Sequence, residues 1–357
     1  MRVLLTNYNL QGRSGTELYI VELALSLLKR GHLPVVYTPR LGKLGLELRE
    51  HTVPVIDNLR KLTEKPDIIH GHHSLPTVEA LLRFPRVPAL FVCHDRLSWT
   101  DDPPPFQRIV RWIAVDHNCR DRLVAEGGIP PEKVQVILNA VDESKFKARG
   151  PLPERPKKAL IFSNQAGHVS AIESACSKIG LSVERLHHLQ ERGQSPETVL
   201  GDFDVVFAKG RCALEALSVG CSVVVCDAFG MGPLVGMHNF EQVRALNCGR
   251  RLLQNEINGE NLARELSRYS PADSAEICRI MRESGTLSGL VDQWLGLYQD
   301  ILDNFDPDKF RLEDEMAEAA DFLVRLNPWI PELSFKYLWQ RGRALSKWWL
   351  KRKLSRD

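Results

Sequence analysis

The amino-acid sequence predicts an α/β protein with two open parallel sheets. Short β-branched runs alternate with helical patterns from Arg2–Thr6 to Lys133–Leu138. A stretch rich in proline and charge, residues 145–158, interrupts the alternation, which restarts at Ala159–Ser163. Strands that alternate with helices are typical of βαβ units, and such sheets bind ligands at the carboxyl ends of their strands. A ligand crevice is therefore expected at the carboxyl edge of each sheet.

The individual elements follow from local periodicity, with apolar β-branched runs read as strands and a 3.6-residue repeat read as helix. The expected strands are 2–6, 34–38, 67–70, 89–93, 111–115 and 133–138 before the linker, then 159–163, 204–207 and 222–226. The expected helices are 16–30, 77–84, 119–126, 169–179, 211–219 and 287–301, followed by two helical segments at 312–325 and 332–354.

Length and composition limit the class of protein. A chain of 357 residues is long for one core and predicts two domains. The 47 basic and 45 acidic residues nearly balance, so nucleic acid is not an expected partner. The eight cysteines form no CxxC pair, which favours a reducing cytosol and argues against zinc. The sequence has no uncharged run near the roughly 18 residues that span a bilayer.

Two polar loops are candidates for phosphate binding. The segment Asn7–Gly15 joins the first strand to a helix, so Gly15 and its neighbours could present backbone amides to a phosphate. An ordinary βα loop is the competing interpretation. In the second half, Lys209 and Arg211 lie at the start of the helix 211–219, where cations and the helix dipole would act together on a phosphate. Alternatively, the two cations are ordinary loop side chains without a role in binding.

Glu215 and the histidines are the other candidate functional groups. Glu215 lies between apolar residues, which favours a ligand-binding carboxylate over a solvated one. His94 and Asp95 follow a buried strand and are candidate catalytic residues, although a lone histidine is often only a structural hydrogen-bonder. His70, His72 and His73 are not expected to form a metal site, because successive strand residues point to opposite faces.

A series of short motifs runs along residues 1–303: Gly12–Glu17, Glu22–Ala24, Lys29–His32, Pro66–His70, Val92–Asp95, Asn139–Asp142 and Ala213–Ala216. In order and spacing they resemble the signatures of family 4 glycosyltransferases, which have the GT-B fold. The resemblance implies two Rossmann-like domains, with the acceptor bound by residues 1–152 and a nucleoside-diphosphate sugar bound by residues 153–303. It also implies that His94 is the active-site histidine and that transfer is metal-independent and retaining.

Further site residues are implied by the resemblance. Glu215 would hold the ribose hydroxyls of the donor, which is expected to be a UDP-sugar, and no separate cofactor is expected. Asn139 lies in one of the matching motifs and is a predicted donor contact. The loop Gly230–Pro233 is expected to bring the amides of Gly230 and Gly232 to the donor, although turn chemistry alone would also explain these glycines.

Two departures from the family pattern bear on activity. Family members commonly carry an additional glutamate at the position of Phe207, so that carboxylate is absent here. The arginine and lysine that usually neutralise the leaving diphosphate are also missing from Ser163–His168. We expect Lys209 and Arg211 to take over the neutralisation, with assistance from His168.

The last segment, 304–357, is predicted to be a helical tail. Its end, Phe335–Arg356, carries eight basic residues and no acidic one, with aromatic residues near helical spacing. This pattern suits an anionic membrane surface, which would place a cytoplasmic protein at the inner face of a membrane. A brace packed back on the N-terminal domain is the alternative, and nucleic-acid binding is a more distant one.

The expected function is transfer of a sugar from a nucleoside-diphosphate donor to a glycan or lipid-linked acceptor in cell-surface polysaccharide synthesis. Retention of configuration is favoured over inversion. A degenerate GT-B protein that binds nucleotide or a partner transferase without turnover is the main alternative, supported by Phe207. A sugar-nucleotide epimerase is a further alternative, although the acid and base pair that it requires is not evident.

Overall fold

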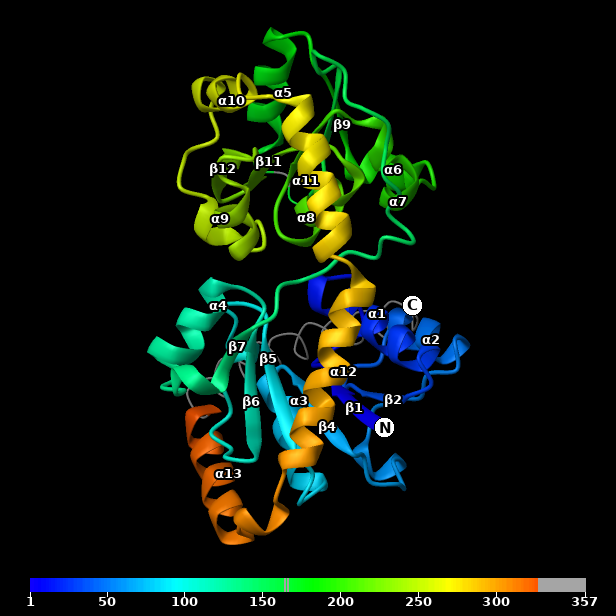
Figure 1. The fold of residues 1–357 in the computed structure, drawn as a ribbon, viewed down its shortest axis with the longest axis vertical. Coiled ribbons are helices and arrows are strands. Elements are labelled where there is room, and N and C mark those ends of the chain that lie inside the picture. The colour runs from blue at the N-terminus through cyan, green and yellow to red at the C-terminus, as the bar shows by residue number, and fades with distance from the viewer. Residues whose placement is uncertain (164, 166, 327–357) are drawn as a thin grey trace, which may run out of the picture. The chain divides into compact units, whose positions relative to one another are not determined.

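The computed structural model describes residues 1–163, 165 and 167–326 of the chain. Residues 1–103 and 109–305 form one compact unit by their internal contacts. The described part of a second unit consists of Pro104–Arg108 and residues 306–326. The first unit contains both sheets, and Figure 1 shows the elements of each unit. The predicted terminal helix at 332–354 lies outside the described residues.

The first sheet has seven strands in the order β3-β2-β1-β4-β5-β6-β7, and all neighbouring pairs are parallel. β4 and β5 are buried along their whole length, as expected for central strands with helices on both faces. The strands are β1 (Arg2–Thr6), β2 (Leu33–Tyr37), β3 (Val55–Ile56), β4 (Ile68–His72), β5 (Ala89–Cys93), β6 (Ile109–Ala114) and β7 (Val134–Val136). Their helices are α1 (Gly15–Lys29), α2 (Lys43–Glu50), α3 (Ser74–Arg83) and α4 (His117–Asp121).

The second sheet has five strands in the order β12-β11-β10-β8-β9. Alternate residues of its central strand enter different hydrophobic clusters, with Val206 in one and Phe207 in the other. The strands are β8 (Lys158–Ile161), β9 (Ser182–Arg185), β10 (Val205–Ala208), β11 (Ser222–Asp227) and β12 (Gly230–Leu234). The helices after β8 are α5 (Val169–Lys178), α6 (Leu186–Glu191), α7 (Pro196–Val199), α8 (Arg211–Val219), α9 (Phe240–Ala245), α10 (Gly259–Leu266) and α11 (Pro271–Ser284).

Several short helical turns complete the fold. Seven are present: η1 (Leu59–Lys61), η2 (Trp99–Asp101), η3 (Arg122–Glu126, a π-helix), η4 (Pro131–Lys133), η5 (Leu200–Asp202), η6 (Arg250–Leu252) and η7 (Pro307–Lys309) among the described residues. The sequence predicts one helix over 119–126, whereas the structure divides this stretch between α4 and η3. The α/β class with two mainly parallel sheets is confirmed.

Strand β12 corrects the prediction of a loop at Gly230–Pro233. It pairs antiparallel with β11, and Met231 exchanges two backbone hydrogen bonds with Asn255, at 2.8 and 3.0 Å. A Cβ atom on Gly232 would lie 2.7 Å from the carbonyl oxygen of Leu252, so this glycine permits a close backbone approach. Gly230 has φ +150°, which also favours glycine. Strand packing therefore accounts for both glycines.

Helix α12 (Leu287–Asn304) follows the second sheet in sequence but contacts the first. Its Trp294 Nε1 donates a 2.9 Å hydrogen bond to the hydroxyl of Tyr19 on α1, and both side chains are buried. Its Tyr298 is hydrogen-bonded to His70 on β4. Figure 1 shows α12 beside α1. The predicted boundary at residue 303 places α12 with the second domain, whereas its buried aromatic side chains pack with the first sheet.

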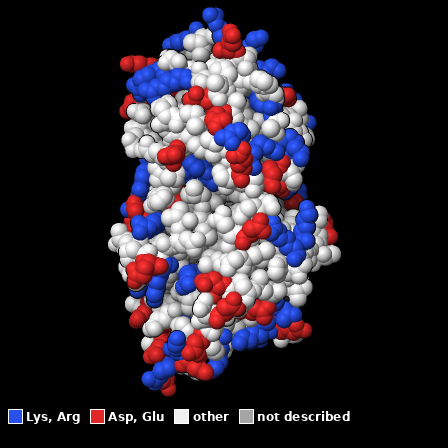
Figure 2. All heavy atoms as spheres, viewed as in Figure 1, with Lys and Arg blue, Asp and Glu red and all other residues white. Residues whose placement is uncertain are grey.

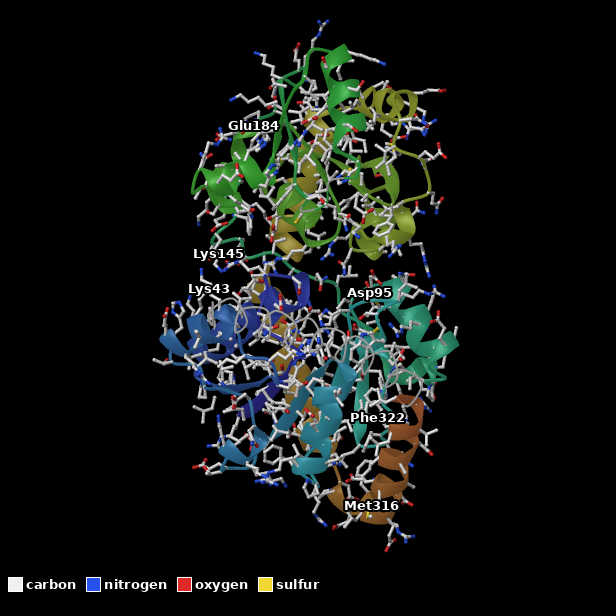
Figure 3. All side chains as sticks on the ribbon, turned by 180° about the vertical axis from the view of Figure 1, so that it is seen from behind. Lys43, Asp95, Lys145, Glu184, Met316 and Phe322 are labelled. Atoms are coloured by element: carbon white, nitrogen blue, oxygen red, sulfur yellow. The ribbon has the colours of Figure 1, made fainter. Side chains whose placement is uncertain are left out.

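Helix α13 (Leu312–Leu326) belongs to the second unit. The guanidinium of Arg108, which is fully buried, donates two hydrogen bonds to the carboxylate of Glu315. The amide of Gln107 donates a 3.2 Å hydrogen bond to Glu318. Phe322 is buried whereas Met316 is 65% exposed, and both side chains are labelled in Figure 3. These contacts tie α13 to Pro104–Arg108.

Surface charge and helix hydropathy agree with the composition. On the face drawn in Figure 2, basic and acidic side chains are interspersed. Within the part of the chain that the structure describes, no helix is long and apolar enough to cross a membrane. The eight cysteines are free thiols, and all except Cys212 are buried.

Candidate functional site

His94 lies directly after β5 and is held from two sides. Its Nε2 is 2.6 Å from Nδ1 of His72, which ends the neighbouring strand β4. Its backbone amide donates a 2.5 Å hydrogen bond to the carboxylate of Asp101 in η2. Parallel pairing of β4 and β5 brings the two strand ends together, so the position of His94 follows from the sheet. Burial lowers the pKa of His94 to about 3, which leaves a neutral imidazole.

The histidines of β4 are arranged differently from the sequence expectation. His70 and His72 point to the same face of the strand, two residues apart, and their rings stack with centroids 4.5 Å apart. The rings of His72 and His94 also stack, at 4.9 Å. His73 points elsewhere, and its Nδ1 accepts a 3.1 Å hydrogen bond from the amide of Tyr8. Among the described residues, no group of three or more His, Cys, Asp or Glu side chains is arranged to hold a metal ion.

Asp95 and Asp101 have different surroundings. The carboxylate of Asp95, labelled in Figure 3, is exposed and accepts hydrogen bonds from the amides of Leu97 and Ser98, at 2.6 and 2.9 Å. It therefore caps the loop that follows β5, and a catalytic role for Asp95 stays a prediction. Asp101 is buried, and burial raises its pKa to about 7. The carboxylate that binds the backbone amide of His94 is thus that of Asp101.

The loop between β1 and α1 has an internal carboxylate. Glu17 is buried and accepts hydrogen bonds from the amides of Gly12 and Ser14, at 3.1 and 2.7 Å. Gly15 is exposed as the first residue of α1. Because Glu17 engages two of the loop amides, the predicted phosphate cradle at Gly15 can use only others. Asn7 is fully buried, and both polar atoms of its side chain are without a partner among the described residues.

Glu215 on α8 shares one arginine with a distant carboxylate. Arg211 Nε donates a 2.7 Å hydrogen bond to Glu215, and the other two guanidinium nitrogens donate to Glu22 on α1. Glu215 is only 6% exposed, so it is not a solvated helix residue. Burial raises its pKa to about 7, because desolvation outweighs the attraction of Arg211, which Glu22 also shares.

Lys209 is paired with Asp227 at the end of β11, whereas His168 is buried without a hydrogen-bond partner among the described residues. Lys209 Nζ lies 2.5 Å from Oδ2 of Asp227, which is buried. His168 immediately precedes α5 and is buried, and neither of its ring nitrogens has a hydrogen-bond partner among the described residues. A buried imidazole without partners is costly, so a polar ligand at the start of α5 would relieve this cost. Both predicted cations of the α8 region, Lys209 and Arg211, have carboxylate partners.

Asn139 lies in the segment between β7 and the linker. Its backbone carbonyl accepts a 2.6 Å hydrogen bond from Arg244, whereas its side-chain oxygen is buried without a partner in the described chain. A donor contact through that oxygen stays a prediction. The predicted contacts of Gly230 and Gly232 also stay predictions, although strand packing explains both glycines.

A cavity of about 480 Å³ lies beside the linker, lined by α1, residues 142–145 and the start of α12. Glu22 and Arg30 line it, as does Lys145, which Figure 3 labels. Arg30 is already paired with Asp292, and Glu22 with Arg211. The lining therefore carries both positive and negative side chains and does not indicate a particular class of ligand.

Sequence reasoning missed four residues near the predicted site: Asn7, Glu22, His72 and Asp101. Asn7 follows a buried strand and His72 ends one. Their positions at strand ends are the signal that could have identified them. The sequence pattern predicts that the helical face with Glu22 packs against the core, and its partner Arg211 is 189 residues away in the sequence. Asp101 follows a polar turn after His94, where a carboxylate suggests loop capping rather than contact with the histidine amide.

The two sheets and their strand order define this chain as a protein with the GT-B fold. Solved structures support that assignment. A glycosyltransferase from Rickettsia africae superposes with a TM-score of 0.62 at 15% identity, over 85% of this chain and 99% of that one. Anabaena HepE in complex with UDP and glucose superposes with a TM-score of 0.56 at 15% identity, over 84% of this chain and 100% of that one.

Residues 13–145 match the family model for Glycosyltransferase Family 4, so the resemblance predicted from the motifs is confirmed there. A curated relative from Arabidopsis thaliana is one of the subunits of phosphatidylinositol N-acetylglucosaminyltransferase. It is 26% identical over 199 residues, which cover 45% of this chain and 44% of the relative. The alignment with this chain thus spans less than half the length of the relative.

Proposed function

We propose that this protein is a glycosyltransferase that moves a sugar from a UDP-sugar to a glycan or lipid-linked acceptor in cell-surface polysaccharide synthesis. The observation that carries the proposal is the pair formed by buried Glu215 and half-buried Arg211 on α8, the helix that follows β10 of a Rossmann-like sheet. Support also comes from the GT-B neighbour that holds UDP and glucose, and from the curated relative, whose name is that of an N-acetylglucosaminyltransferase component.

The donor would be held by residues after β8, β10 and β11. Glu215 would accept hydrogen bonds from the ribose hydroxyls, which are charge-assisted when the carboxylate is ionised. Arg211 and Lys209 would neutralise the diphosphate after exchanging Glu22 and Asp227 for phosphate oxygens. His168 would satisfy a buried nitrogen on the same ligand. Fixed cations would then supply the leaving-group charge stabilisation, so that transfer proceeds without a divalent metal.

The acceptor would lie beside His94. Retention of configuration is proposed, with the departing diphosphate oxygen taking the proton of the acceptor hydroxyl as the new glycosidic bond forms on the same face. His94 would position the sugar rather than act as the base, because its pKa of about 3 leaves little basicity. Asp95 would shape the loop that borders the acceptor.

A non-catalytic GT-B protein is the second candidate function. Phe207 is fully buried in β10, so no carboxylate is available at that position. Arg211 and Lys209 are both paired with protein carboxylates. A protein that binds nucleotide or a partner transferase without turnover would have the same features.

Ligand binding and turnover separate the two functions. Thermal unfolding would be followed with UDP, GDP, ADP and their sugar conjugates, and the stabilised combination would then enter a hydrolysis assay. A transferase is expected to release sugar slowly to water even without acceptor. Stabilisation by a nucleotide sugar without any release, and without transfer to glycan acceptors, would favour the non-catalytic protein.

Removal of both cations gives a sharper test of the diphosphate site. The double substitution Lys209→Ala/Arg211→Ala is expected to weaken UDP far more than uridine, because only UDP presents phosphate charge. Calorimetry would measure both ligands on each variant. Lys178→Ala, which removes an exposed cation from the last turn of α5, is the matched control. If the double variant unfolds, Lys209→Ala alone provides the comparison, and equal losses for UDP and uridine would contradict the assignment.

The tail is proposed to contact an anionic membrane. Phe335–Arg356 lies outside the described residues, and its eight cations would contribute on the order of 1 kcal/mol each before screening. Deletion of Phe335–Asp357 is expected to abolish co-sedimentation with anionic vesicles while activity on a soluble acceptor persists. Unfolding or loss of nucleotide binding on deletion would instead identify the tail as a brace.

A further inference from the structure

The contact between His72 and His94 restricts the hydrogen bonds that His94 can make. Nε2 of His94 is engaged by Nδ1 of His72 at 2.6 Å, so Nδ1 is the ring nitrogen that remains for another partner. His72 is fully buried, and its own Nε2 has no partner among the described residues. His94 is half-buried, which leaves part of its ring accessible.

Both imidazoles are neutral, because burial lowers the pKa of His94 to about 3 and that of His72 well below its usual value. A neutral imidazole has one N–H donor and one acceptor nitrogen. The two rings therefore share a single proton along the Nδ1–Nε2 contact, and the direction of this hydrogen bond sets the tautomer of each ring.

The buried Nε2 of His72 decides the direction. If His94 donated, His72 would carry its proton on Nε2, which would be a buried N–H without a partner among the described residues. If His72 donates, its Nε2 is an acceptor without a partner, and buried orphan acceptors are less rare than buried orphan donors. Donation from His72 leaves the proton of His94 on Nδ1.

We propose that His72 is a positioning residue that fixes the tautomer of His94, so that His94 presents a protonated Nδ1 to a sugar hydroxyl or ring oxygen. This assignment rests on the proposed transferase function only for the identity of the ligand. In this role His94 donates a hydrogen bond and transfers no proton. The stack of His70 on His72 limits rotation of the His72 ring and thereby supports the same geometry.

The tautomer is measurable without turnover. The full-length protein, labelled with ¹⁵N at its 11 histidines, would be studied by long-range ¹H–¹⁵N correlation, with the His94 signals identified through His94→Gln. The expected result is a proton on Nδ1 of His94. A proton on Nε2 of His94 would overturn the proposal, and neither result depends on finding a substrate.

Substitutions of His72 test the cause. His72→Leu removes the donor, so the proton of His94 should no longer be held on its Nδ1. His72→Asn keeps an N–H near the former Nδ1 position of His72, so it is expected to restore the Nδ1–H tautomer of His94. His117→Leu, which removes an exposed imidazole at the start of α4, is the control. An unchanged His94 tautomer in folded His72→Leu would also overturn the proposal, and if that variant does not fold, the wild-type spectrum and His72→Asn still decide.

Turnover provides a separate readout once a substrate is known. Loss of one oriented hydrogen bond in His72→Leu is expected to lower kcat about tenfold while the KM for the donor changes little, with rescue by His72→Asn. A protonated Nδ1 of His94 in a protein that transfers no sugar would refute the proposed function but leave the positioning role intact. Equal loss of kcat in His72→Leu and His72→Asn would refute the positioning role.

Discussion

Replacement of Glu215 by alanine is expected to weaken UDP binding by about 1.5–3 kcal/mol, the usual contribution of hydrogen bonds to a charged group. This corresponds to a loss of roughly ten- to more than a hundredfold in affinity. Arg211 keeps its second partner in the variant, because Glu22 binds both terminal guanidinium nitrogens. The fold should therefore survive, and the loss should reflect the ligand contact.

Calorimetry with UDP and uridine measures this loss. Both ligands carry the ribose, so both should weaken in Glu215→Ala, in contrast to the double variant without Lys209 and Arg211. Glu184→Ala is the matched control, since it removes a partly exposed carboxylate from β9 of the same sheet, labelled in Figure 3. Unchanged affinity for both ligands in a folded Glu215→Ala protein would remove Glu215 from the donor site.

Breaking the ion pair between Arg108 and Glu315 is expected to have the largest effect on stability. Glu315→Leu would leave the fully buried guanidinium of Arg108 without this carboxylate, and loss of one partner from a buried pair costs about 3–5 kcal/mol. The loss of stability is expected in the unit formed by Pro104–Arg108 and α13, so amide hydrogen exchange along α13 is the appropriate measurement. Faster exchange is expected throughout that helix.

Two further variants show why the loss of the carboxylate changes the protection of α13. Arg108→Met/Glu315→Leu replaces both charges with apolar groups and should recover most of the protection, because a buried pair often contributes little over apolar packing. Glu313→Ala removes a carboxylate that is 76% exposed and should change protection very little. The double variant and Glu315→Leu could instead exchange equally fast. That result would show that α13 is stabilised by the attraction within the pair, and that burial of one charge without the other is not what destabilises Glu315→Leu.

The strands were predictable because their apolar β-branched runs are local signals. β1 and β5 have the predicted bounds, and α8 covers the predicted residues. β12 was missed because glycine and proline within Gly230–Leu234 indicate a turn, while the pairing that stabilises the strand comes from β11 and Asn255. The packing of α12 was missed because helical periodicity identifies an apolar face but not the sheet that covers it.

The candidate site residues stay predictions, but their pairings in the structure can be compared with what the sequence signals. The end of β5 locates His94, whereas His168 and Glu215 lie at and within the helices that follow β8 and β10, whose carboxyl ends form one edge of the second sheet. The ion pair of Arg211 with Glu22 joins residues 189 positions apart, and no local pattern reports such a contact. The stacking of His70 on His72 followed from a period of two along β4, which the comparison of adjacent residues His72 and His73 obscured.

The pairing of Arg211 has a thermodynamic consequence for any anion that binds it. Glu22 and Glu215 already occupy the guanidinium in the free protein, so Glu22 acts as a tethered competitor of the incoming anion. The apparent dissociation constant is then the intrinsic constant divided by the fraction of molecules in which Arg211 has left Glu22. Neutralising the competitor in Glu22→Gln would raise that fraction and is expected to tighten anion binding, which calorimetry with UDP would measure.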